Sequence, residues 1–216
     1  MLFRRVALCL VALASAASAN RTANAFIDHL LSDMTVEARH RDLDPLRAKP
    51  FAIKVKSNSF GNRDLKANFT QGSFVGLSGI HRLTDCSYER TGFLMTMGCH
   101  VALTTVRVDM NADVKGDSLS GTRHAISTSS IVHPNTHALI EISGHPHSQR
   151  AELKSVSINT INMKTTVVQG KLDLNASRYN NFASQVNEAL SRQLASALRG
   201  QYSLGLQTLL SRRTMP

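Results

Sequence analysis

The sequence contains no tryptophan, and phenylalanine and tyrosine make up only 5% of its 216 residues. An apolar interior built from this chain is therefore largely aliphatic and offers no tryptophan for an aromatic box. The chain also lacks a glycine-rich phosphate loop and a His-Glu-x-x-His zinc motif. Its basic residues are scattered, without the Lys/Arg block or interleaved aromatics of a nucleic-acid surface. We expect no nucleic-acid partner and no cofactor.

Long hydrophobic runs are missing as well, since no segment reaches the roughly 20 apolar residues that a membrane-spanning helix needs. The apolar run at residues 6–14 is about half that length. It follows Arg4-Arg5 and precedes the Ala-Ser-Ala of residues 17–19, which is the order typical of a signal peptide. We expect residues 1–19 to be a cleaved signal peptide. Residues 20–216 would then form a single secreted, extracellular domain that does not span a membrane.

Cysteine is scarce, with three in the chain, and Cys9 falls within the expected signal peptide. Cys86 and Cys99 remain, an even number for an oxidising compartment. We expect them to form a disulfide, and two free buried thiols are the alternative.

Three Asn-x-Ser/Thr sequons begin at Asn20, Asn68 and Asn175, and in an exported chain each is a candidate glycosylation site. The formal net charge of +10 at pH 7 favours anionic partners, such as anionic lipid surfaces or glycans. Solubility alone is the other explanation for this charge.

Hydrophobic periodicity predicts a helix, many strands and a second helix. Apolar residues follow one helical face over residues 23–39, and the proline of Asp44-Pro45 stops that pattern. Apolar and polar residues alternate over residues 51–56, 65–70 and 93–103, which is typical of half-buried strands. From about residue 181 to 210 an apolar residue recurs at every fourth position. This predicts a helix ~45 Å long, with a kink or break at Gly200.

Two of the predicted strands change phase. The apolar set resumes at Val106 after Leu103, and at Ile161 after Ile158. Such a slip turns side chains to the opposite face unless a bulge absorbs it, and bulges bend strands. We therefore predict an α+β fold in which a long curved antiparallel sheet, a super-roll, wraps around the long C-terminal helix, with an additional N-terminal helix.

Three short stretches resemble the group 7 mite allergens and their arthropod relatives. They are residues 132–137 (Val-His-Pro-Asn-Thr-His), residues 76–85 (Gly-Leu-Ser-Gly-Ile-His-Arg-Leu-Thr-Asp) and Asp44-Pro45-Leu46. The resemblance implies the fold of the tubular lipid-binding superfamily, which includes the bactericidal/permeability-increasing protein, whose N-terminal half these allergens resemble, and the insect juvenile-hormone carriers. It also implies weak binding of lipids or lipopeptides. The two cysteines are not part of the mite pattern.

Two motifs offer a catalytic or metal-binding alternative. Residues 116–119, Gly-Asp-Ser-Leu, match the nucleophile block of one esterase class, with Ser118 as the nucleophile. The block lies mid-chain and no Asp-x-x-His follows it, so a polar turn explains it better. Four histidines fall within fifteen residues, but they occupy two loops without a helix to align them for zinc. We therefore expect neither an enzyme nor a metal site. These histidines are His133, His137, His145 and His147.

The aliphatic interior remains as the candidate site, because a sheet rolled around one helix can leave an apolar gap for a ligand. Our leading hypothesis is a secreted, non-catalytic binder of lipid or another small apolar ligand. The alternative is a secreted interaction protein with a fully packed core, which contacts host or immune proteins through its surface. The expected pocket lining comprises Val101, Leu103, Ile140, Ile142, Leu153, Val156, Leu190 and Leu194.

Overall fold

The computed structural model describes residues 2–58, 63–118, 120–145 and 150–216, and of residues 2–19 it describes the helical backbone. The helices are α1 (Leu2–His40), the 3₁₀ turn η1 (Leu77–Gly79), α2 (Ala176–Ala197), the π-helical turn η2 (Leu198–Tyr202) and α3 (Ser203–Leu210). The strands are β1 (Leu46–Arg47), β2 (Phe51–Val55), β3 (Leu65–Val75), β4 (His81–Arg82), β5 (Ser87–Thr91), β6 (Leu94–Ala102), β7 (Arg107–Lys115), β8 (His124–Val132), β9 (His137–Gly144), β10 (Glu152–Ser157) and β11 (Met163–Gln169).

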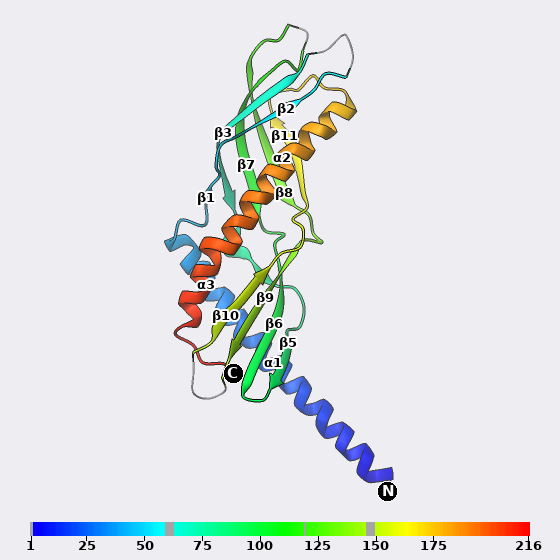
Figure 1. Cartoon of the computed structure of the whole chain (residues 1–216), viewed down its shortest axis with the longest axis vertical. Coiled ribbons are helices and arrows are strands. Elements are labelled where there is room, and N and C mark those ends of the chain that lie inside the picture. Colours follow the sequence, from blue (N-terminus) through cyan, green and yellow to red (C-terminus); the bar gives the residue numbers. More distant parts are fainter. Residues whose placement is uncertain (1, 59–62, 119, 146–149) are drawn as a thin grey trace.

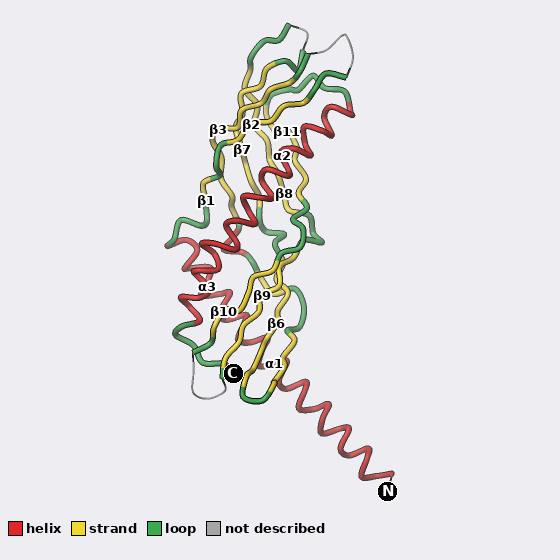
Figure 2. Tube along the Cα trace, in the orientation of Figure 1, coloured by secondary structure: helices red, strands yellow, loops and turns green. Residues whose placement is uncertain are grey.

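Two curved antiparallel sheets lie end to end along an elongated body (Figure 1). The upper sheet has the order β1-β3-β7-β8-β11, and β2 also pairs with β3. The lower sheet has the order β10-β9-β6-β4, and β5 also pairs with β6. Each sheet curls without closing on itself, and helices cover the open side (Figure 2). The predicted fold class is confirmed: curved antiparallel strands accompany a long C-terminal helix and an N-terminal helix, and the strands divide between two sheets.

Helix α2 covers the open side of the upper sheet and contacts both of its edges, β2 and β11. The Asn175 side chain caps its first turn by accepting a hydrogen bond from the Arg178 backbone N–H at 3.0 Å. This cap starts the helix five residues before the predicted position. The predicted apolar stripe is buried along its whole length, through Phe182, Val186, Leu190, Leu194, Leu198, Tyr202, Leu206 and Leu210.

The π-helical turn η2 stands where Gly200 predicted a kink or a break. An apolar residue at every fourth position exceeds the 3.6 residues of an α-helical turn, so the stripe drifts by ~40° per repeat. A π turn accommodates one extra residue and reduces this drift. The helix therefore continues into α3 without a break, and its apolar stripe stays on the sheet.

Both phase changes in the sequence mark crossings between the two sheets. The crossing at residues 103–106 separates β6 in the lower sheet from β7 in the upper sheet, and the crossing at residues 158–162 separates β10 from β11. The expectation of a bulge inside one continuous strand is therefore wrong at both places. A strand that enters a second sheet must leave its first ladder, and the change of phase there points its apolar face toward the next part of the core. Register shifts do occur elsewhere, in the β3–β7, β9–β10 and β8–β11 pairs.

A third crossing, residues 133–136, joins β8 to β9 and lies between the other two. The Leu103 N–H donates to the Thr136 carbonyl at 3.4 Å, and the His133 N–H donates to the Asn162 carbonyl at 2.8 Å. Thr136 is buried, and its hydroxyl lies 3.4 Å from the Asn162 carbonyl. The three crossings thus satisfy one another's backbone groups where the strands change sheets.

Helix α1 covers the open side of the lower sheet together with α3, and these two helices pack against each other. The predicted face at residues 23–39 is confirmed, with Ala23, Ile27, Leu30, Leu31 and Met34 buried and Phe26 half-buried. The helix itself extends further toward the N-terminus than predicted, to Leu2. Within the described residues, no helix combines the length and apolar character needed to cross a bilayer.

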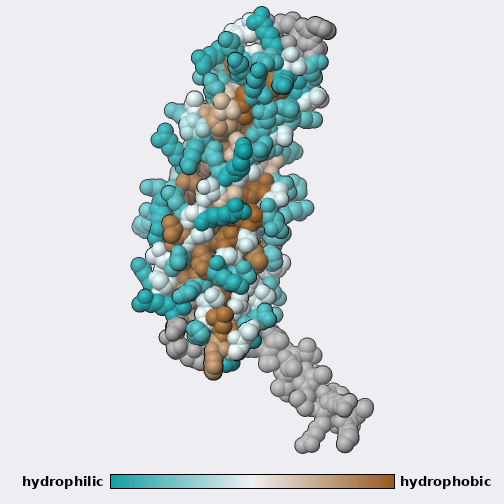
Figure 3. Space-filling model, viewed as in Figure 1, coloured by the Kyte–Doolittle hydropathy of each residue, from teal (hydrophilic) through white to brown (hydrophobic). Residues whose placement is uncertain are grey.

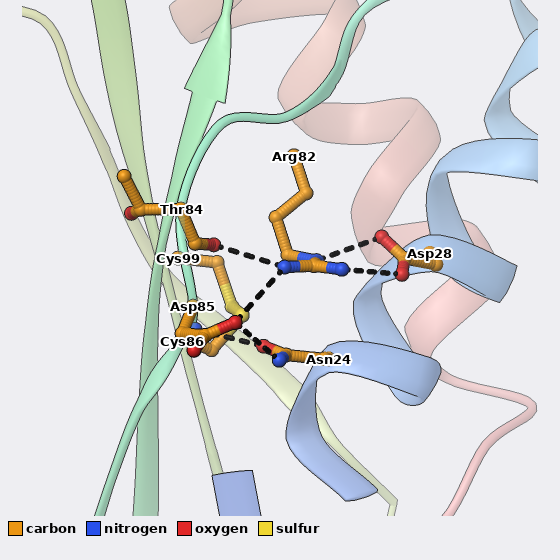
Figure 4. A network of polar contacts seen from close by, with 7 residues as sticks. All are labelled: Asn24, Asp28, Arg82, Thr84, Asp85, Cys86 and Cys99. Carbon is orange, nitrogen blue, oxygen red and sulfur yellow. Dashed lines mark hydrogen bonds and ion pairs between the residues drawn. A yellow bond between two sulfur atoms is a disulfide. The ribbon is translucent and has the colours of Figure 1, made fainter. Parts of the chain in front are cut away.

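The predicted disulfide is present between Cys86, immediately before β5, and Cys99 in β6. Beside it, Arg82 joins the sheet to α1 (Figure 4). Its guanidinium donates two hydrogen bonds to the Asp28 carboxylate, both at 2.9 Å. The Asn24 side chain accepts from the Cys86 N–H at 2.8 Å. These contacts hold α1 against the lower sheet.

Phe93 departs from the predicted strand pattern. Its position begins the alternating apolar set of β6, yet its side chain is 80% exposed. It follows Gly92, whose φ of 64° forms the turn between β5 and β6. The alternation in sequence matches alternating burial only from Met95 onward, where β6 also begins to pair with β9.

Candidate ligand groove

Two glutamines fix α2 to one edge of the upper sheet. The Gln193 side chain accepts from the Lys49 N–H at 2.7 Å and donates to the Lys49 carbonyl at 3.0 Å. Two turns earlier, Gln185 makes the same pair of contacts with Lys54 in β2, at 3.4 and 2.9 Å. Each side-chain amide thus takes the place of a neighbouring strand and satisfies the free backbone groups of an open edge.

Shorter side chains fix α2 to the opposite edge. The Thr165 hydroxyl of β11 donates to the Asn187 amide oxygen at 2.6 Å, and the Ser191 hydroxyl donates to the Ile161 carbonyl at 2.8 Å. The helix therefore spans the gap between two edges that do not pair with each other. Because a single helix fills this gap, space remains on both of its sides.

The first space, which we name the β1 groove, has a volume of about 560 Å³ and lies between α2, η2 and the β1 edge. This is within the range of ~300–1,000 Å³ that is common for small-molecule sites. On this side of the body, Figure 3 shows hydrophobic surface interrupted by hydrophilic side chains. The groove is lined by Leu46, Arg47, Lys49, Phe74, Arg192, Gln193, Ser196, Ala197, Gly200 and Gln201.

The second space, the β11 groove, also has a volume of about 560 Å³ and lies between α2 and the crossing that precedes β11. Its lining is richer in amides and hydroxyls, with Asn159, Asn162, Asn180, Asn187, Ser184 and Ser191 among its residues. Two of these groups are already engaged, because Ser191 donates to the Ile161 carbonyl and Asn187 accepts from the Thr165 hydroxyl. The β1 groove is therefore the better candidate for an apolar ligand.

The wall of the β1 groove contains the π turn. Gly200 lies at its centre, and apart from its chain neighbours and the backbone of its own helix, no heavy atom lies within 4 Å of the position that a Cβ would occupy there. Leu46 stands opposite Phe74 in the β1–β3 ladder, and with Ala197 these two give the groove an apolar floor. Turns of π-helix occur often at functional sites. Sequence reasoning used Gly200 only as a kink signal, although a glycine within an apolar stripe can also mark open space.

The eight residues predicted to line a pocket belong to the packed interior or its margin. Leu153 and Val156 are half-buried and pack against the core, and the other six are at most 1% exposed. Most of the set lies in or beside the lower sheet, whereas Leu190 and Leu194 are on α2 above it. None of the eight lines the β1 or β11 groove. Their role as ligand contacts stays a prediction.

The alternative catalytic residue, Ser118, has a hydroxyl 2.9 Å from the Ser120 hydroxyl, within a row of hydroxyls that continues to Thr122. The neighbouring His124 instead places its Nε2 2.9 Å from the Lys171 carbonyl. This row of hydroxyls after β7 is the polar turn that the sequence favoured.

The histidine-rich segment is dispersed over the described surface. His133 and His137 are exposed on the crossing before β9 and at the start of that strand, and His147 lies outside the described residues. The His137 ring instead meets the His100 ring edge-on, with centroids 5.0 Å apart. In the part of the chain that the structure describes, no three His, Cys, Asp or Glu residues gather as metal ligands.

The three sequon asparagines differ in their surroundings. Asn68 is exposed in β3, and Asn20 lies within α1. Asn175 is exposed, but its side chain is already engaged by the cap of α2 and by a hydrogen bond to Asn58 at 3.1 Å.

No protein-family model matches this chain, and no curated protein matches it either. Solved structures do. Lipopolysaccharide binding protein is 12% identical over 87% of this chain, with a TM-score of 0.50. This chain therefore shares its fold with that protein. This chain spans only 40% of the lipopolysaccharide binding protein chain. Takeout 1 of Epiphyas postvittana is also 12% identical, covering 88% of this chain and 93% of its own, with a TM-score of 0.46.

Proposed function

We propose that this protein is a secreted, non-catalytic carrier of lipid or another small apolar ligand, and that the β1 groove is its binding site. The observation that carries the proposal is the gap between the edges of the upper sheet, which α2 covers without filling. The groove combines an apolar floor with polar groups at its rim, as ligand sites commonly do. The fold shared with a lipopolysaccharide binding protein supports this choice.

The remaining parts of the proposal concern export and family. We infer that residues 1–19 are removed as a signal peptide and that residues 20–216 form one secreted domain. Asn68, Asn175 and Asn20 are the proposed glycosylation sites. The sequence motifs at Asp44-Pro45 and residues 132–137 support kinship with the group 7 allergens.

The competing proposal is a secreted interaction protein that binds host or immune proteins through its surface. The dense packing of Val101, Leu103, Ile140 and Ile142 favours it, because these residues leave no space beside one another for a ligand. The two proposals differ in whether a small apolar molecule binds at all.

The test begins with the full chain expressed in insect cells and recovered from the medium. N-terminal sequencing should read from Asn20, and organic extraction should release bound lipid. Titration with the neutral dye Nile red should then give saturable fluorescence.

Gly200→Leu is the decisive variant. A leucine there enters open space beside the groove and improves helix propensity, so the fold should persist while dye affinity falls at least tenfold. Gln207→Leu, on an exposed position of α3, is the matched control and should bind as the parent does. A protein that takes up neither lipid nor dye would favour the interaction protein instead.

A further inference from the structure

The rim of the β1 groove has one sign of charge. Arg47, Lys49 and Arg192 line it, all three are exposed, and no aspartate or glutamate is among its lining residues. A groove that bound only neutral apolar molecules would gain nothing from three cations at its opening.

Two of these cations are free to meet a ligand. Within the described residues, neither Arg47 nor Lys49 has an ion-pair partner. Arg192 lies 3.5 Å from Glu188 on the helix surface, with both side chains more than 60% exposed. Exposed pairs of this kind are weak, so an anion in the groove competes easily for Arg192.

The backbone holds the free cations in place. Lys49 is fixed to α2 by both hydrogen bonds of the Gln193 amide. The backbone of Arg47 is held by β1, which pairs with Ser73 of β3. The two charges therefore stand on an anchored segment beside the apolar floor formed by Leu46 and Phe74, and ordering them for a ligand costs little backbone entropy.

We propose that the β1 groove selects a single-chain amphiphile with an anionic head group. The acyl chain lies on the apolar floor, and the carboxylate or phosphate pairs with Arg47 and Lys49, with Arg192 as a third contact. Arginine offers a planar pair of N–H donors that suits either head group, and lysine adds a point charge. This inference rests on the proposed function and names the class of ligand for the same site.

The test compares ligands that share one palmitoyl chain and differ in the head group. Palmitate, palmitoyl lysophosphatidate, palmitoyl lysophosphatidylcholine and monopalmitoylglycerol are titrated below their micellar concentrations, by displacement of Nile red. Both anionic ligands should bind about tenfold or more tightly than monopalmitoylglycerol at low salt. This preference should shrink at 0.5 M salt, because screening weakens exposed charges. Comparison of palmitate with lysophosphatidate shows whether a carboxylate or a phosphate fits better.

The double variant Arg47→Gln/Lys49→Gln should lose about tenfold in affinity for the anionic ligands and keep the parent affinity for monopalmitoylglycerol. The control Lys115→Gln/Lys164→Gln removes the same charge from exposed positions on β7 and β11, away from the groove, and should change neither.

Equal affinity of the parent for all four head groups would overturn the head-group inference and leave the proposed carrier function standing. An equal loss of affinity for the anionic ligands in the control double variant would also overturn it. The preference for anionic head groups would then come from the net charge of the protein and not from the cations at the rim. Failure of every ligand to bind would instead reject the carrier function itself.

Discussion

The upper and lower halves of the molecule differ in how helices cover the concave side of the sheet. Each half is an open antiparallel sheet whose concave side must be covered. In the lower half two helices, α1 and α3, pack against each other and against the sheet edges. Arg82 ties α1 to the sheet, and a disulfide links Cys86 to Cys99 within the sheet region. In the upper half α2 alone covers the opening, and the β1 and β11 grooves lie on its two sides. The comparison teaches that a single covering helix leaves a groove of about 560 Å³ along each of its sides.

The largest expected effect separates the two halves by their cores. Leu190→Ala and Leu206→Ala each remove a fully buried side chain, from α2 and α3 respectively. Each should lower the free energy of unfolding by about 2–5 kcal/mol in denaturant titrations. Only Leu190→Ala should also weaken Nile red binding, because α2 forms the wall of the groove. Similar losses of affinity in both variants would contradict the separation.

A somewhat smaller effect is expected from the disulfide of the lower half. Cys86 and Cys99 are 13 residues apart, and a loop of about this length contributes ~3 kcal/mol on the chain-entropy model. The double variant Cys86→Ala/Cys99→Ala should unfold at a correspondingly lower denaturant concentration and keep the ligand affinity of the parent. The parent treated with reductant serves as the control. A loss of binding in the double variant would show that the lower half controls the groove.

The smallest effect concerns Asp44, which lies between α1 and β1 and accepts hydrogen bonds from Gly76 and Ser78 in the segment that joins β3 to β4. Burial by itself raises the pKa of this carboxyl, but hydrogen bonds from the Ser78 hydroxyl, the Ser78 N–H and the Gly76 N–H, with the charge of Arg39, lower it below its ordinary value. The unfolded chain therefore binds the proton more readily, so stability from Asp44 is present above pH 5 and is lost as the pH falls below about 4.

Asp44→Asn should thus cost about 1 kcal/mol at pH 7 and little at pH 3. Thermal unfolding of both proteins at the two pH values measures this, with the difference between them as the readout because other carboxylates titrate in both. A constant difference across the range would show that the Asp44 charge contributes nothing.

The sequence predicted the periodic helices and strands of both halves, but it did not predict the crossings between the two sheets. The apolar stripe through Leu190 and Leu206 and the alternation of β6 predicted the helix and the strand closely, because burial of one face imposes a period. Leu103 and Val106 show the limit of that argument. Their change of phase was visible, but a bulge and a crossing between two sheets produce the same local pattern, and only long-range pairing distinguishes them.

The sequence by itself determined the aliphatic character of the interior and predicted the class of the fold and the pairing of Cys86 with Cys99. These features depend on hydrophobic periodicity and on composition, which are properties of the sequence itself and do not require the tertiary structure. The tertiary structure decided where space remains. Arg47 and Gly200 are 153 positions apart in the chain and become neighbours in one groove because α2 alone bridges an open sheet. A void is a property of how elements pack, so no single segment encodes it.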